Sequence, residues 1–172
     1  MSMYTKLAKS AAEHFIRTGE TLPLPSALPG ELFRQRACYV SIWENPGRYL
    51  RGMAGEALPR QANLALEIIM NTVEAITAQP YRRIRQADMG YLSYQVALLG
   101  PLQRISDSEH LDPVRFGLYV KSTKGKSALL LPRRTGVETA NDQIATALRE
   151  AGIDTRQEEA TMYRFAVSYF DS

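Results

Sequence analysis

The chain has 172 residues, of which 45% are hydrophobic and 23% charged, with a formal net charge of +3. This composition excludes a disordered chain, and the length fits a single domain, 1–172, either undivided or split into a larger and a smaller lobe. No apolar run reaches the roughly 20 residues that span a bilayer, and the N-terminus lacks a signal-peptide pattern, so we expect a cytoplasmic protein. The single cysteine, Cys38, excludes an internal disulfide, and its place in a predicted strand indicates a core residue more than a nucleophile.

The first part of the chain predicts a helix and a strand. Apolar residues at helical spacing over 4–17 predict an amphipathic helix, and Gly19 lies where it should end. A proline-rich connector follows, after which Leu32 and Phe33 are expected to dock on the core. Residues 37–43 are apolar on both faces, which is typical of a central strand.

A hairpin and a long helix come next. The turn signal Asn45-Pro46-Gly47 joins the central strand to 49–51, so the two should pair and deliver Leu50-Arg51-Gly52-Met53-Ala54-Gly55 as a loop at the strand end. An apolar stripe then predicts a helix from Pro59 to Pro80. Asn71 lies beside this stripe and is an exposed residue, a loop cap or a ligand contact.

The remaining elements predict antiparallel pairing. Alternation predicts a strand over 91–99, strands over 116–122 and 127–131 joined as a hairpin, a helix over 140–151 and a last strand over 161–170. Because hairpins pair neighbouring strands antiparallel, the predicted fold class is α+β, with a mainly antiparallel sheet flanked by helices.

The segment at 50–55 is the main candidate site. Gly52 and Gly55 permit a close backbone approach, and Arg51 offers a planar fork of five donors to an anionic or carbonyl-bearing partner. The alternative is a tight connection with a solvated arginine. The glycine pair lacks the lysine and third glycine of a nucleotide-binding loop, and the two histidines lack metal-ligand spacing. Neither a cofactor nor a metal is therefore expected.

Basic residues are concentrated in the middle of the chain. Residues 82–134 contain ten Lys or Arg and four Asp or Glu, a net charge of +6, so the remainder sums to −3. Such a segment can meet phosphates or acidic partners, whereas solvated charge is the alternative. Arg82, Arg83 and Arg85 follow Tyr81 and form a candidate group for phosphate or nucleic-acid contacts, because arginine forks bind phosphates and tyrosine rings stack on bases.

Together these features resemble the AMMECR domain family over residues 5–170. The resemblance rests on the motif at 50–55 after a hairpin, the long helix before Pro80, the strand at 91–99 and the closing Met162-Tyr163-Arg164-Phe165. It implies an α+β fold with a larger lobe, a smaller lobe and a cleft between them near the motif. The family has no established activity, and its members are associated with a radical-SAM protein and a Memo-type protein.

The family motif is Leu-Arg-Gly-Cys-Ile-Gly, and this chain matches it in part. Arg51, Gly52 and Gly55 match, and Asn71 matches an asparagine on the family's following helix. The motif cysteine is Met53 here, which cannot form a thiolate, so chemistry that needs that cysteine is absent.

Two further positions depart from the family. Its Asp-Pro-Arg-Phe aligns with Gln79-Pro80-Tyr81-Arg82, which loses the acid, and a His-Gly pair aligns with Phe116-Gly117, which loses an acid-base or ligand group. The backbone-shaping residues are thus kept, while three polar or reactive side chains are replaced.

Three functional hypotheses follow. The first is a non-catalytic or regulatory module that binds a small anionic ligand or a partner segment in the cleft near the motif, through Arg51, Gly52, Met53, Gly55 and Asn71. The second is an enzyme component that positions a substrate for a radical-SAM or Memo-type partner. The third is nucleic-acid binding through the basic middle segment. Whether the chain is catalytic, and its oligomeric state, are left open by the sequence.

Overall fold

The computed structural model describes residues 1–78 and 80–172. The chain divides into two compact units: unit 1 is Met1–Leu98 with Ser168–Ser172, and unit 2 is Leu99–Val167. Each unit has its own antiparallel strands, flanking helices and cluster of buried apolar side chains. The predicted α+β class with an antiparallel sheet is confirmed.

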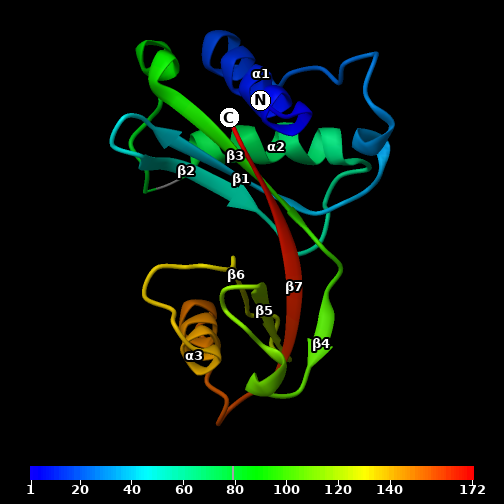
Figure 1. Cartoon of the computed structure of the whole chain (residues 1–172), viewed down its shortest axis with the longest axis vertical. Coiled ribbons are helices and arrows are strands. Elements are labelled where there is room, and N and C mark those ends of the chain that lie inside the picture. The colour runs from blue at the N-terminus through cyan, green and yellow to red at the C-terminus, as the bar shows by residue number, and fades with distance from the viewer. Residues whose placement is uncertain (79) are drawn as a thin grey trace. The chain divides into compact units, whose positions relative to one another are not determined.

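Unit 1 is a sheet with two helices. Its elements are α1 (Met3–Thr18), the 3₁₀ helix η1 (Gly30–Phe33), β1 (Cys38–Glu44), β2 (Tyr49–Gly55), α2 (Leu64–Thr77), the 3₁₀ helix η2 (Gln86–Tyr91) and β3 (Leu92–Leu99). The strand order is β2-β1-β3, and the end of the last strand of the chain, β7 (Ala160–Asp171), follows β3 (Figure 1). Helix α2 packs against β1 and β2, and α1 packs against α2.

Local sequence signals explain both ends of α1. The Ser2 side chain accepts the N–H of Thr5 at 3.2 Å, which caps the first turn. Gly19 takes the left-handed conformation, with φ of 75°, and its N–H closes on the Phe15 carbonyl. The predicted helix over 4–17 and its end at Gly19 are confirmed.

Three expectations for unit 1 need correction. The segment 50–55 lies within strand β2 and is not a loop at its end. Helix α2 begins at Leu64, five residues after Pro59, because the Asn63 side chain accepts the N–H of Leu66 at 2.9 Å and caps the helix there. Of the two residues expected to dock, Leu32 is buried but Phe33 is 53% exposed.

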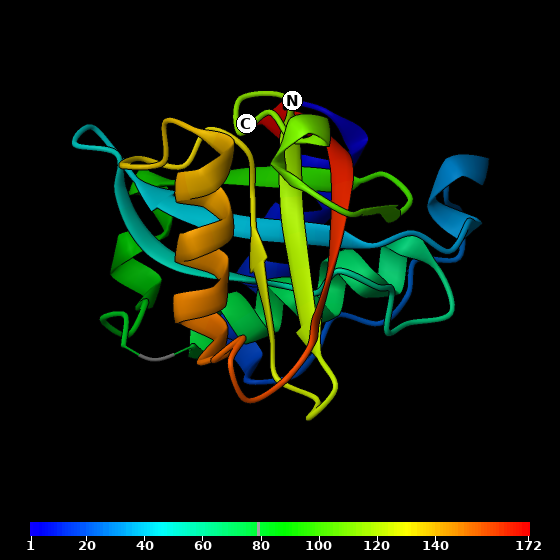
Figure 2. The same cartoon turned by 90° about the horizontal axis from the view of Figure 1, so that it is seen from below.

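Unit 2 is a smaller sheet with one helix. Its elements are β4 (Gln103–Ile105), the 3₁₀ helix η3 (Ser108–His110), β5 (Phe116–Ser122), β6 (Ser127–Leu130), α3 (Ala140–Ala151) and most of β7. Strand β7 pairs with β5, which pairs with β6, and β4 pairs with β7. Helix α3 lies along β5 and β6 (Figure 2).

The predicted strands and helix of unit 2 occur in the predicted order, and β4 and η3 are additional elements. Thr139 and Asp142 form a capping box at the start of α3, and Gly152 ends it in the left-handed conformation. Gly125 has φ of 82° in the β5–β6 turn, as a tight hairpin requires. Strand β4 was not predicted, because three residues are too few to show alternation.

None of the helices among the described residues combines the length and the apolarity needed to cross a bilayer.

Candidate functional site

The segment 50–55 is held in β2 by pairing with β1, and Arg51 lies at an irregularity in that pairing. Gly52 is opposite Ile42 and Leu50 is opposite Trp43, so Arg51 is the extra residue of a β-bulge. A bulge bends the strand and re-aims the side chain that it carries. The side chain of Arg51 contacts groups of its own unit.

Arg51 is buried, with 5% of its surface exposed, and its guanidinium is occupied by protein groups. It forms ion pairs with Glu44 of β1 and, at 3.4 Å, with Asp88 of η2, and it donates to the Arg83 carbonyl at 3.4 Å. Its Nε is buried and has no hydrogen-bond partner among the described residues. Arg51 is therefore not a solvated arginine; it ties the 83–88 segment to the hairpin.

The two motif glycines are sites of close packing. A Cβ on Gly52 would lie 1.9 Å from the carbonyl oxygen of Ala75, so only glycine lets β2 approach α2 this closely. A Cβ on Gly55 would lie 2.6 Å from the carbonyl oxygen of Cys38 and 2.4 Å from the ring of Tyr39. Both glycines thus fix where the strand lies against its neighbours.

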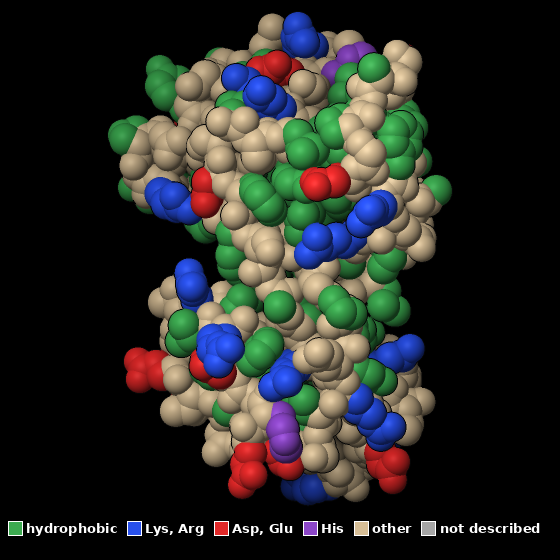
Figure 3. All heavy atoms as spheres, turned by 45° about the vertical axis from the view of Figure 1, so that its right-hand side comes forward, with side chains coloured by type: hydrophobic (Ala, Val, Ile, Leu, Met, Phe, Trp, Pro, Cys, Tyr) green, Lys and Arg blue, Asp and Glu red, His purple; other side chains and the backbone are tan. Residues whose placement is uncertain are grey.

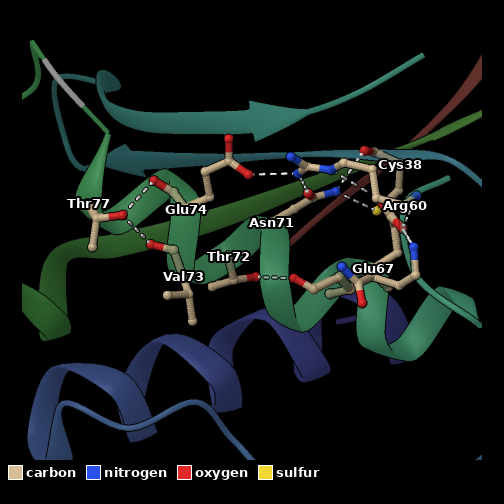
Figure 4. Close-up of polar contacts among 10 residues, drawn as sticks. Cys38, Arg60, Glu67, Asn71, Thr72, Val73, Glu74 and Thr77 are labelled. Atoms are coloured by element: carbon tan, nitrogen blue, oxygen red, sulfur yellow. Dashed lines mark hydrogen bonds and ion pairs between the residues drawn. The ribbon is translucent and has the colours of Figure 1, made fainter. Parts of the chain in front are cut away.

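Asn71 is the centre of a partly buried polar cluster that joins α2 to β1 and to the loop after β2 (Figure 4). The residue is fully buried, which excludes the exposed asparagine considered above. Its Nδ2 donates to the Cys38 carbonyl at 3.0 Å and lies 3.4 Å from Cys38 Sγ, while its Oδ1 accepts from Arg60 at 2.8 Å. All of these partners lie within unit 1.

Arg60 and Glu67 complete this cluster, and neither is among the site residues predicted from the sequence. The buried Glu67 carboxylate accepts the N–H groups of Arg60 and Gln61 at 2.8 and 2.7 Å, which holds the loop against α2. Arg60 also pairs with Glu74 at 2.6 Å. The signal was present in the sequence: Glu67, Asn71 and Glu74 are spaced four and three residues apart, so they line one face of an otherwise apolar helix.

Cys38 is a core thiol. It is fully buried, and burial raises its pKa from 9.0 to about 12, although the Asn71 side chain partly opposes the rise. A thiol with this pKa stays protonated at neutral pH, and the thiolate is the nucleophilic form. The interpretation of Cys38 as a core residue agrees with this geometry.

The positions that depart from the family motifs have ordinary packing roles where the structure describes them. Met53 is half-buried on β2, opposite Ser41 of β1. Phe116 is half-buried on β5 and lies under the guanidinium of Arg164, 4.5 Å from the ring centre. Gln79, at the position of the family acid, lies outside the described residues.

The arginines at 82, 83 and 85 are exposed, and they differ in their partners. Arg82 lies 3.6 Å from the Asp88 carboxylate. The side chains of Arg83 and Arg85 form no ion pair within the described part of the chain. Arg83 lines a pocket of about 600 Å³ at the C-terminal ends of α1 and α2. Of these three arginines, Arg83 therefore borders a concavity in unit 1.

The rest of the basic middle segment belongs to unit 2, where several of its charges are paired. Lys126 binds the buried Glu158 carboxylate at 2.7 Å, and Arg134 forms a two-pronged ion pair with Glu150. On the face shown in Figure 3, Lys and Arg side chains are dispersed among acidic, hydrophobic and other polar groups. The charge run of the sequence is thus divided between two units and partly neutralised.

Comparison with known proteins places the chain in a family. The AMMECR1 family model matches residues 5–170. A protein of Thermotoga maritima is 34% identical over 97% of this chain and 96% of its own length. Protein CA_C1420 of Clostridium acetobutylicum is 31% identical over 96% of this chain, which corresponds to 35% of that longer protein.

A solved structure shares the fold. The crystal structure of the uncharacterized protein PH0010 from Pyrococcus horikoshii superposes with a TM-score of 0.87, covering 98% of this chain and 89% of that one at 24% identity. With the family model spanning nearly the whole sequence, the chain belongs to the AMMECR1 family.

Proposed function

We propose that this chain is a non-catalytic binding module that holds a small anionic ligand beside the Arg51–Gly55 strand. The observation that carries the proposal is the link made by Arg51. Its guanidinium joins the motif strand to the Arg83 carbonyl and to Asp88, whereas the side chain of Arg83 forms no ion pair with the acids that the structure describes. Arg51 thus holds the backbone at residue 83, and this backbone carries the Arg83 side chain.

The state of the reactive groups near the motif supports a non-catalytic role. Cys38 is a buried, protonated thiol, and Asn71 is held between Cys38 and Arg60. Met53 replaces the cysteine of the family motif and supplies no thiolate. The described groups around the motif therefore shape and brace the site more than they supply a nucleophile or a general base.

In this proposal Arg51 is a positioning residue, and the ligand contacts come from the basic group that it presents. Arg83 and Arg85 would supply charge-assisted hydrogen bonds to a carboxylate or phosphate. Gly52 and Gly55 would act indirectly, because they set how closely β2 lies against α2 and β1. Because these contacts already hold the site in place, binding costs less conformational entropy.

The test is a titration of the full chain with inorganic phosphate. Two-dimensional NMR monitors the amide chemical shifts during the titration, and this method detects millimolar binding. We expect shifts at residues 81–86, and their loss in an Arg83→Gln, Arg85→Gln double variant. Arg104→Gln is the matched control, because Arg104 is an exposed arginine of unit 2. Arg51→Met should weaken binding while Arg83 and Arg85 remain in place. Shifts that persist in the double variant, or that are absent from the wild-type chain, would contradict the proposal.

A further inference from the structure

The pocket at the ends of α1 and α2 has the size and apolar floor of a small-molecule site. Its volume is about 600 Å³, within the range of roughly 300 to 1,000 Å³ that is usual for ligand pockets. The floor is formed by apolar side chains from three segments: Phe15 and Ile16 of α1, Ile76 of α2 and Ile84 of the following segment. A pocket with such a floor favours an apolar group of the ligand.

The charged side chains that line this pocket are both arginines. Arg17 comes from the last turn of α1 and Arg83 from the segment held by Arg51, and no carboxylate is among the lining residues that the structure describes. The Arg17 Nε donates to the Glu13 carbonyl at 3.1 Å, which leaves its terminal nitrogens without a described partner. Two cations at a pocket with apolar side chains on its floor complement a ligand that has an anionic head and an apolar part.

The C-terminal ends of α1 and α2 both line the pocket. A helix C-terminus carries partial negative charge on its free carbonyl groups. An anionic head is therefore expected to lie at the arginines and away from these carbonyls.

The third wall is held in place before any ligand arrives. Ile84 is buried, with 4% of its surface exposed, and the preceding carbonyl, that of Arg83, accepts from Arg51 at 3.4 Å. Tyr81 is half-buried and lines the pocket beside them. The wall that carries Arg83 is thus attached to the motif strand of the same unit.

From these observations we infer that the pocket binds an amphipathic anion, with an alkyl chain on the Phe15–Ile84 floor and a carboxylate or phosphate head on Arg17 and Arg83. This inference rests on the proposed anion-binding function and adds the apolar half of the ligand. A fatty carboxylate and an alkyl phosphate share this chemistry, and the experiment separates them.

The experiment is calorimetric titration of the full chain with octanoate, octyl phosphate, octanol, octylamine and inorganic phosphate. We expect at least one octyl anion to bind at least about tenfold more tightly than inorganic phosphate, since burying two methylene groups already has that effect. It should also bind more tightly than octanol and octylamine. Whether octanoate or octyl phosphate binds better identifies the head group.

Two variants locate the binding. Thr18→Trp places a large side chain at the pocket from an exposed position and should abolish binding of the octyl anion, while Thr135→Trp, at an exposed position of unit 2, should leave it unchanged. Arg83→Gln should weaken the octyl anion but not octanol. If neither octanoate nor octyl phosphate binds more tightly than inorganic phosphate, the inference is overturned and the proposed function is left standing. Absence of binding by every anion would overturn both.

Discussion

Arg51 of β2 and Asp88 of η2, 37 residues apart in the sequence, form an ion pair at 3.4 Å. The Asp88 carboxylate also accepts the N–H of Arg85 at 2.9 Å, so it fixes the turn that follows the basic group. Asp88 thereby connects Arg51 to the turn at residues 85–88. A substitution at Asp88 should therefore affect both.

The first prediction concerns the pH dependence of this link. The N–H of Arg85, and then the guanidinium of Arg51, hold the pKa of Asp88 below its ordinary value of 3.8. A depressed pKa in the folded state stabilises the fold above the unfolded-state value, and the benefit is lost as the pH falls through the folded-state value. Asp88→Asn should therefore lower the free energy of unfolding at neutral pH, and its difference from the wild type should shrink below pH 3.8.

Urea unfolding at a series of pH values measures this difference. Glu109→Gln, at an exposed position, is the control for the general effect of removing one acid. A difference between wild type and Asp88→Asn that stays constant down to the acid-unfolding range would show that the Asp88 charge does not stabilise the fold.

The second prediction concerns the approach of β2 to α2. In Gly52→Ala the new methyl group would lie 1.9 Å from the Ala75 carbonyl oxygen, which is backbone and cannot rotate away. We expect a loss of about 3 kcal/mol in the free energy of unfolding, as for severe overpacking of a core. Gly90→Ala is the matched control, because nothing lies within 4 Å of its Cβ position. Equal stability of the two variants would mean that α2 shifts without penalty.

The apolar periodicity of the sequence and its capping and turn residues were sufficient to predict most of the helices and strands. The apolar spacing of α1 and the alternation of β3 depend on local patterns, and the capping residues Gly19 and Thr139 mark helix ends through their own chemistry. These signals need no information about distant residues. The fold class could therefore be predicted from the order of the elements.

The site could not be predicted in the same way, because its geometry depends on long-range contacts. Gly52 looks like a loop residue in the sequence, and its role becomes visible only with Ala75 beside it. Arg51 has a chemically reasonable ligand role until Glu44 and Asp88 are found on its guanidinium. Pro59 suggested a helix start, but the helix begins at Leu64 after a loop that the buried Glu67 carboxylate holds in place.

The third prediction concerns Asn71. Its fully buried amide joins the buried Cys38 carbonyl to the guanidinium of Arg60, which lies at the surface. Asn71→Leu fills a similar volume but leaves the Cys38 carbonyl without this donor, so we expect a loss of about 2 kcal/mol in the free energy of unfolding. The exposed helix residue Asn141 provides the control, and Asn141→Ala should change stability by no more than about 0.5 kcal/mol. Urea denaturation followed by circular dichroism compares the two, and equal losses would refute a bracing role for Asn71.

The last prediction uses the Cys38 thiol as a reporter of the same cluster. Burial raises its pKa from 9.0 to about 12, so the folded state keeps the thiol neutral at pH values where the unfolded state ionises it. The resulting stabilisation is fully present below pH 9.0 and is lost as the pH rises toward 12. The stability advantage of the wild type over Cys38→Ala should therefore decrease above pH 9.0. Burial also raises the pKa of Tyr94, but Tyr94 is present in both proteins and its effect cancels in the comparison.

At neutral pH, alkylation of Cys38 by iodoacetamide should be slow in the native protein and fast in urea. Rapid alkylation of the folded chain would show that the cluster around Asn71 opens readily. That result would contradict the stabilising role of this cluster between α2 and β1.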